Sequence, residues 1–258
     1  MMLSAFFSAL IPMLAGAQLI LTLVLMKGEI CPGQRGRIHR LFPVLALLWA
    51  SVAVQHLLAM VVTALIAGLY TRVKTGKTRD SGPLMLLWLA DMAALVLVIM
   101  TIVGMPDWIG GVVIAFSTIL SGAISAHLLL VMAKSRLQAF HKLLPAVGVL
   151  AAMMITVCIV PFTYGLSDEQ LSIMTSSVLI YFSLMIAGLL LWCWHLFLSS
   201  TVSRVLLALS CLLLLSSMTG FNSLYQHNSQ NQHIQLSQQS LNCPAHQPDC
   251  VIQRPDSR

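Results

Sequence analysis

The residues of this chain best suited to bind a metal or take part in chemistry are histidines, a methionine and an aspartate that lie within long apolar segments. Met60 follows His56 by four residues, so in a helix both side chains would share one face. An imidazole and a thioether form a soft ligand pair that suits Cu(I) and adds no buried negative charge. His127 offers a second imidazole from another apolar segment. We therefore take His56, Met60 and His127 as candidate copper ligands.

Asp91 is the only acidic residue well inside an apolar segment. A carboxyl group within a bilayer is costly unless it is paired, so such a residue is a functional candidate. A carboxylate commonly orients a metal-bound imidazole by accepting its second N–H, and we expect Asp91 to support a histidine in this way. The alternative is that Asp91 and the histidines are isolated polar residues, each satisfied by a neighbouring helix.

A haem site is a second chemical hypothesis. His127 and His195 lie a few residues from the ends of their apolar segments, at ends that we expect to face the same side of the membrane. Two imidazoles at one depth on facing helices can hold one haem b. On this alternative the protein is a haem-bearing anchor for electron transfer.

The elements that must position these residues are membrane-spanning helices. Hydrophobic residues make up 58% of the 258 positions and charged residues only 9%, whereas a soluble domain carries roughly 25% charged residues. The mean hydropathy is +0.90. A soluble enzyme or a nucleic-acid-binding domain is therefore excluded.

Seven stretches have about the 20 apolar residues that a helix needs to cross a bilayer. We therefore predict an all-α, polytopic transmembrane helix bundle with seven helices, in a domain of residues 1–221. The expected helices are 2–26, 41–70, 84–104, 109–133, 143–164, 171–197 and 205–221.

Loop charges suggest the orientation in a bacterial inner membrane. Lysine and arginine gather in the loops after the expected helices 41–70, 109–133 and 171–197, and such loops usually face the cytoplasm. With seven helices, the N-terminus is then cytoplasmic and the C-terminus exterior. The segment 27–40 disagrees, because it also carries four basic residues yet falls outside.

Residues 222–258 are rich in Gln, Asn and Ser, which predicts a disordered exterior tail. Cys243 and Cys250 lie seven residues apart in this tail. They would form a disulfide in an oxidising compartment, or bind a soft metal ion together with His246, or do neither.

Two short segments resemble the seven-helix CtaG-type membrane proteins, which assist assembly of copper-containing cytochrome oxidase. The segment from Val54 to Met60 is similar to that family's Gln-His-x-Leu-Leu-x-Met stretch, and the segment from Tyr164 to Leu171 resembles its Asp-x-Gln-type turn. The resemblance implies copper handling at His56 and a respiratory oxidase as partner. The family's further paired-histidine helix has only His127 as a counterpart.

The sequence carries no phosphate-binding loop, zinc-protease motif or hydrolase nucleophile motif. We therefore predict an accessory protein rather than an enzyme, concerned with copper handling or cytochrome oxidase assembly. Besides the haem-bearing anchor, the other alternative is a membrane interaction subunit with no site of its own.

Overall fold

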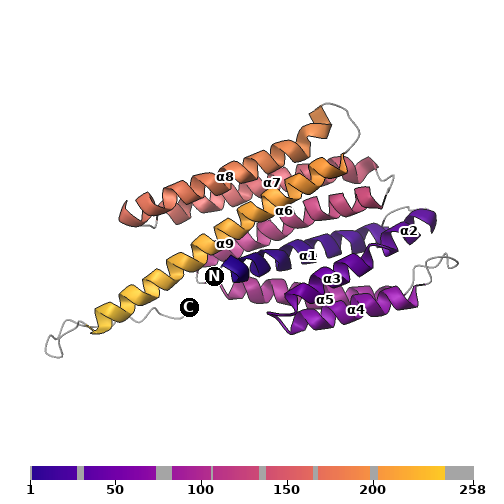
Figure 1. The fold of residues 1–258 in the computed structure, drawn as a ribbon, viewed down its shortest axis with the longest axis horizontal. Helices are drawn as coiled ribbons and strands as arrows, with labels where there is room; N and C mark the ends of the chain where they lie inside the picture. The colour runs from indigo at the N-terminus through magenta and orange to yellow at the C-terminus, as the bar shows by residue number, and fades with distance from the viewer. Residues whose placement is uncertain are drawn as a thin grey trace.

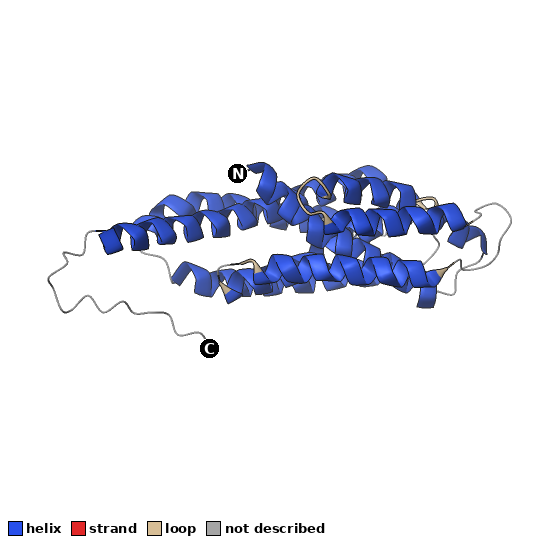
Figure 2. Cartoon of the chain, turned by 90° about the horizontal axis from the view of Figure 1, so that it is seen from below, coloured by secondary structure: helices blue, strands red, loops and turns tan. Residues whose placement is uncertain are grey.

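The computed structural model describes residues 2–27, 32–73, 83–105, 107–133, 138–164, 168–197 and 203–241 (Figures 1 and 2). Within these ranges the regular structure is entirely helical, which confirms the predicted all-α class. The helices are α1 (Met2–Lys27), α2 (Pro32–His39), α3 (Phe42–Val52), α4 (Leu58–Arg72), α5 (Leu84–Val103), α6 (Trp108–Met132), α7 (Gln138–Tyr164), α8 (Asp168–Phe197) and α9 (Arg204–Leu241).

Six of the described helices are long and apolar enough to cross a membrane, and α4 is a shorter apolar helix. A helix satisfies its backbone hydrogen bonds internally, which is what the hydrocarbon core of a bilayer demands. The long helices run side by side in one elongated bundle (Figure 1). The protein is therefore a multi-pass helical membrane protein, as its composition predicts.

The single helix expected over residues 41–70 is divided in two. Helices α3 and α4 pack against each other as a hairpin, joined by a turn at residues 53–57. Figure 1 shows that α4 returns to the end of the bundle where α2 and the start of α3 lie. No proline or glycine occurs between Val52 and Leu58, so the sequence has no helix-breaking residue that would predict the turn. The division lets each half bury its own apolar face, α3 against α1 and α4 against α5.

Helix α6 is the centre of the bundle and contacts α1, α5, α7 and α9. Its buried face is built from small residues, among them Ser121, Gly122 and Ala126. Gly122 meets Gly16 of α1 so closely that a side chain on either residue would collide with the backbone of the other helix. Small residues allow such close approach between membrane helices. The small residues of this face therefore let α1 and α6 pack in direct backbone contact.

Helix α9 does not end where the composition changes at residue 222. It continues to Leu241, so the part of the expected disordered tail up to this residue is helical. Asn222 and Tyr225 are both buried, which shows that the packed part of α9 passes the expected boundary. Residues 242–258, including Cys243, His246 and Cys250, lie outside the described residues.

Helix α2 buries an ionisable side chain outside the membrane-spanning segments. His39 is 3% exposed and its ring lies 5.6 Å from the ring of Phe42, centroid to centroid. Neither ring nitrogen has a hydrogen-bond partner among the described residues. Burial lowers the pKa of His39 below its ordinary value, and the nearby positive charge of Arg35 lowers it further. The folded protein therefore favours neutral His39.

Acidification below about pH 6.5 is expected to destabilise the folded protein through His39. The unfolded chain takes up this proton at a higher pH than the folded one, so stability falls as the pH drops through the interval between the two pKa values. The loss is at most about 1.4 kcal/mol per pH unit for one proton. Unfolding in detergent at pH 7.5 and pH 5.5 measures it. His39→Leu should flatten this dependence, and an unchanged pH dependence in that variant would contradict the assignment.

Candidate functional site

Asp91 is held in a buried polar cluster contributed by α1, α3 and α5. The Trp49 indole Nε1 donates to Gln18 Oε1 at 2.8 Å, and Gln18 Nε2 donates to Asp91 Oδ1 at 2.8 Å. None of the three residues is more than 1% exposed. An indole N–H can only donate, so Trp49 forces the amide oxygen of Gln18 towards itself and the amide nitrogen towards Asp91. The cluster therefore fixes the position of a carboxyl group inside the bundle.

Thr22 extends this cluster along α1. It lies four residues after Gln18 on the same helical face and is buried beside the Asp91 carboxyl group. Its hydroxyl makes no hydrogen bond of normal geometry among the described residues. The cluster thus combines one firmly held carboxyl oxygen with a hydroxyl group that still has hydrogen-bonding capacity.

A second buried polar cluster joins α6, α7 and α8. Trp192 Nε1 donates to His127 Nδ1 at 2.9 Å, and His127 Nε2 lies 2.9 Å from His141 Nδ1. His127 and Trp192 have no exposed surface, and His141 is half-buried near the start of α7. Because the indole only donates, His127 Nδ1 must be the acceptor. A neutral His127 then carries its proton on Nε2, and this N–H donates a hydrogen bond to His141 Nδ1.

Both ring nitrogens of His127 are therefore engaged in hydrogen bonds within the bundle. A metal ion or haem iron could bind His127 only by displacing Trp192 or His141. The other proposed haem ligand, His195, lies on α8, but its side chain is outside the described residues. His141, the partner of His127, is not among the candidate residues that the sequence indicated.

The three candidate copper ligands do not form one site. His56 is exposed in the turn between α3 and α4, and Met60 is 55% exposed in the first turn of α4. His127 is fully buried in the Trp192 cluster, so it does not complete a site with them. Among the described residues, no group of three or more His, Cys, Asp or Glu side chains is arranged to hold a metal ion.

Asp91 also differs from its expected role, since its carboxyl oxygen accepts from the Gln18 amide rather than from an imidazole. Sequence reasoning missed Gln18, Trp49 and Trp192. Gln18 is the only amide side chain in the apolar segment 2–26. A single polar side chain in such a segment is the feature by which the sequence could have identified it. The two tryptophans could not be distinguished from the aromatic residues that commonly lie at membrane interfaces.

The bundle and its two buried polar clusters define a polytopic helical membrane protein with ionisable groups held inside the membrane. Residues 2–221 match the family described as an integral membrane domain, and the chain belongs to that family. The match ends at residue 221, while α9 continues to Leu241.

An uncharacterized protein from Haemophilus influenzae is 38% identical to this chain over 140 residues, which cover 50% of this chain and 52% of the relative. The chain thus matches about half the length of this relative. No solved structure matches the chain significantly.

Proposed function

We propose that this protein is an accessory subunit of the bacterial plasma membrane that binds another integral membrane protein through the tip of the α3–α4 hairpin. The observation that carries this proposal is the exposed, non-helical turn at residues 53–57 between two short apolar helices. Non-helical backbone at membrane depth is tolerated where protein or a water-filled cavity covers it. A partner protein supplies such a cover.

The depth of the turn follows from helix lengths. Helix α4 has 15 residues and rises about 22 Å, whereas the hydrocarbon core is about 30 Å thick. Helix α3 begins and helix α4 ends at the same end of the bundle (Figure 1). The turn between them therefore lies within the apolar part of the bilayer. This position makes contact with lipid unfavourable for its polar groups.

The side chains of the turn point away from the rest of the protein. Val54 is 83% exposed and Leu57 is 81% exposed, and Gln55 and His56 between them are also exposed. The backbone N–H groups of Gln55 and His56 are satisfied by Val52 O at 3.0 and 3.1 Å. The Gln55 amide and the His56 imidazole are therefore the polar groups offered to a partner, framed by two apolar side chains.

Site-specific photo-crosslinking in cells tests this proposal. A benzophenone amino acid at Leu57 is expected to form a discrete adduct with one other membrane protein. The same residue at Leu150, which is 61% exposed on α7, is the matched lipid-facing control. Equal labelling patterns at both positions, or adducts only with a second copy of this chain, would overturn the accessory role.

Copper delivery to a respiratory oxidase is the second candidate function, and the same turn favours it. Ala59 N donates to His56 O at 2.8 Å and Met60 N to Leu57 O at 3.0 Å, so the turn winds directly into α4. His56 and Met60 therefore lie within about one helical turn of each other, both exposed. Together they offer a transient soft-metal pair, completed by a ligand from the partner.

Loss of cytochrome oxidase activity at limiting copper is expected for His56→Ala and Met60→Leu, with recovery when copper is added. Met85→Leu, a similar change at a 75% exposed position of α5, is the control. Full activity of both variants at limiting copper would reject copper delivery. It would leave the crosslinking result at Leu57 as the separate test of the accessory role.

The hairpin also supports a definite membrane orientation. Because α4 returns to the end where α3 begins, α2, the end of α1 and the end of α4 lie at the same end of the bundle (Figure 1). Every lysine and arginine of the described residues then lies at that end of the bundle: Lys27, Arg35, Arg37, Arg40, Arg72, Lys142 and Arg204. Asp107 and the start of α8 lie at the opposite end. The positive-inside rule makes the basic end cytoplasmic, and α1 then begins outside.

Cysteine labelling is expected to place position 37 inside the cell. In a background without other cysteines, Arg37→Cys should react with an impermeant maleimide only after permeabilisation, whereas Asp107→Cys should react in intact cells. Both positions are exposed in the folded protein. This orientation replaces the seven-span expectation of a cytoplasmic N-terminus, and labelling of position 37 in intact cells would restore that expectation.

A further inference from the structure

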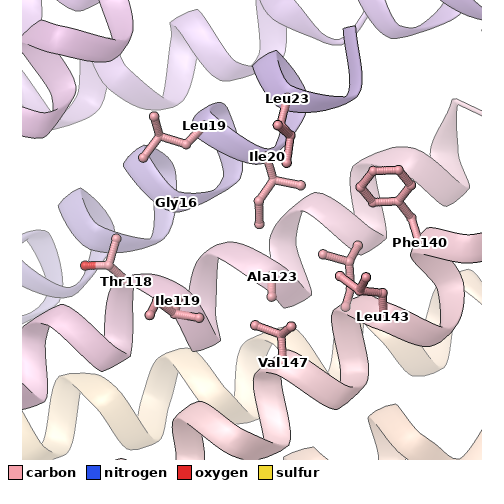
Figure 3. Close-up of a pocket in the computed structure, with 11 residues that line it drawn as sticks. Gly16, Leu19, Ile20, Leu23, Thr118, Ile119, Ala123, Phe140, Leu143 and Val147 are labelled. Atoms are coloured by element: carbon pink, nitrogen blue, oxygen red, sulfur yellow. The ribbon is translucent and has the colours of Figure 1, made fainter. Parts of the chain in front are cut away.

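We propose that a groove between α1, α6 and α7 binds an acyl chain of an anionic phospholipid from the leaflet at the basic end of the bundle. The groove encloses about 250 Å³ (Figure 3). It is lined by Gly16, Leu19, Ile20 and Leu23 of α1, by Thr118, Ile119 and Ala123 of α6, and by Phe140, Leu143, Leu144 and Val147 of α7. This inference does not depend on the partner proposed for the hairpin.

The groove arises from the close contact of Gly16 with Gly122. These glycines bring the backbones of α1 and α6 together, and the groove runs from Gly16 past larger side chains such as Ile20 and Leu23 towards the end of α1. Figure 3 shows Leu23, Phe140 and Leu143 around the end of the groove that lies farthest from Gly16. Ile119, Leu23 and Leu143 are 42%, 51% and 54% exposed, so the groove opens to the lipid side of the bundle.

The lining selects hydrocarbon. Thr118 has the only side-chain polar atom in the lining, and its hydroxyl donates to Ile114 O of its own helix at 2.9 Å. The groove therefore offers no free polar side chain to a ligand. From Gly16 to Leu23 it extends about 10 Å along α1. A helix, about 10 Å across with its side chains, would need several times the enclosed volume over this length. One flexible acyl chain matches the space.

Two cations select the headgroup. Lys27 lies four residues after Leu23, on the same face of α1, and is exposed at the end of that helix. Lys142 is next to Leu143 and is exposed in the first turns of α7. Long lysine side chains near helix ends reach the membrane interface while their stems stay among apolar groups. A lipid phosphate above the groove would lie between these cations, and each contributes favourably to binding of an anionic lipid.

Native mass spectrometry of the delipidated protein tests the proposal with palmitoyl-oleoyl phosphatidylglycerol and palmitoyl-oleoyl phosphatidylcholine. The wild-type protein is expected to retain one phosphatidylglycerol with roughly tenfold preference over phosphatidylcholine, given the two lysines. Ile119→Trp fills the groove and should reduce retention of both lipids at least fivefold. Leu150→Trp, a lipid-facing change elsewhere on α7, is its control, and thermal unfolding of both variants verifies that they are folded.

The headgroup is tested separately from the chain. Lys27→Gln with Lys142→Gln should leave acyl-chain retention in place but reduce the preference for phosphatidylglycerol to less than twofold. Arg72→Gln with Arg204→Gln removes the same charge from the same end of the bundle and should leave the preference unchanged. Equal retention by Ile119→Trp and Leu150→Trp would overturn the groove, and equal preference in the two double variants would overturn the headgroup site.

Discussion

Gly122→Ala is expected to destabilise the folded protein by about 3 kcal/mol, an unusually large effect for the addition of one methyl group. A Cβ at Gly122 would lie 2.7 Å from the carbonyl carbon of Gly16 and 3.0 Å from the backbone nitrogen of Ala17. Both are backbone atoms of α1, so the collision cannot be relieved by rotating a side chain. The helices α1 and α6 must separate instead, which loosens the centre of the bundle.

The matched control for this prediction is Gly68→Ala. Gly68 also lies in a helix, α4, but a Cβ there would meet no atom within 4 Å. This change should be neutral or stabilise the protein by up to about 1 kcal/mol, because alanine favours the helix. Unfolding of both variants by SDS titration in mixed micelles measures the difference. Similar stability of Gly122→Ala and the wild type would show that α1 and α6 do not cross at these glycines.

Gln18→Leu is expected to cost about 2–4 kcal/mol, since it removes the partner of both Trp49 and Asp91. A buried donor or acceptor that loses its partner costs more than a normal hydrogen bond contributes. Replacing the whole cluster with Gln18→Leu, Trp49→Phe and Asp91→Leu removes the unpaired groups. The triple variant should therefore recover most of the loss, and SDS titration of both variants measures it. A triple variant no more stable than Gln18→Leu would contradict the hydrogen-bonded arrangement.

Asp91→Asn separates a structural from a functional role for the cluster. The asparagine keeps an oxygen that can accept from Gln18, so stability should stay within about 1 kcal/mol of the wild type. If the carboxyl group takes part in the proposed copper delivery, oxidase activity at limiting copper should fall in this variant while stability does not. A loss of stability as large as that of Gln18→Leu would instead assign Asp91 to the support of the fold.

The membrane class and most spans of this protein could be predicted from the sequence because both are local properties. A run of about 20 apolar residues determines that a segment crosses the bilayer as a helix, whatever its neighbours are. The same local information placed Asp91 and His127 inside the membrane.

The polar clusters could not be predicted because their partners are far apart in the chain. Asp91 and Gln18 are separated by 73 residues, and Trp192 and His127 by 65. Which polar residues meet depends on how α1, α5, α6 and α8 are arranged, and hydropathy carries no information about that arrangement. The copper hypothesis grouped His56 with His127 because both are histidines in apolar segments, whereas the packing places one on the hairpin tip and buries the other.

The hairpin is the feature that only the tertiary structure decided. Residues 41–70 are apolar enough to read as one span, and the turn at residues 53–57 contains neither proline nor glycine. With the turn, the two shorter helices pack against different neighbours, α3 against α1 and α4 against α5, and both Trp49 and Ile66 are fully buried. This single turn returns the end of α4 to the end of the bundle where α2 and the end of α1 lie (Figure 1). The local charges thus indicated that basic residues would gather on one side, and the tertiary fold decided which helix ends share that side.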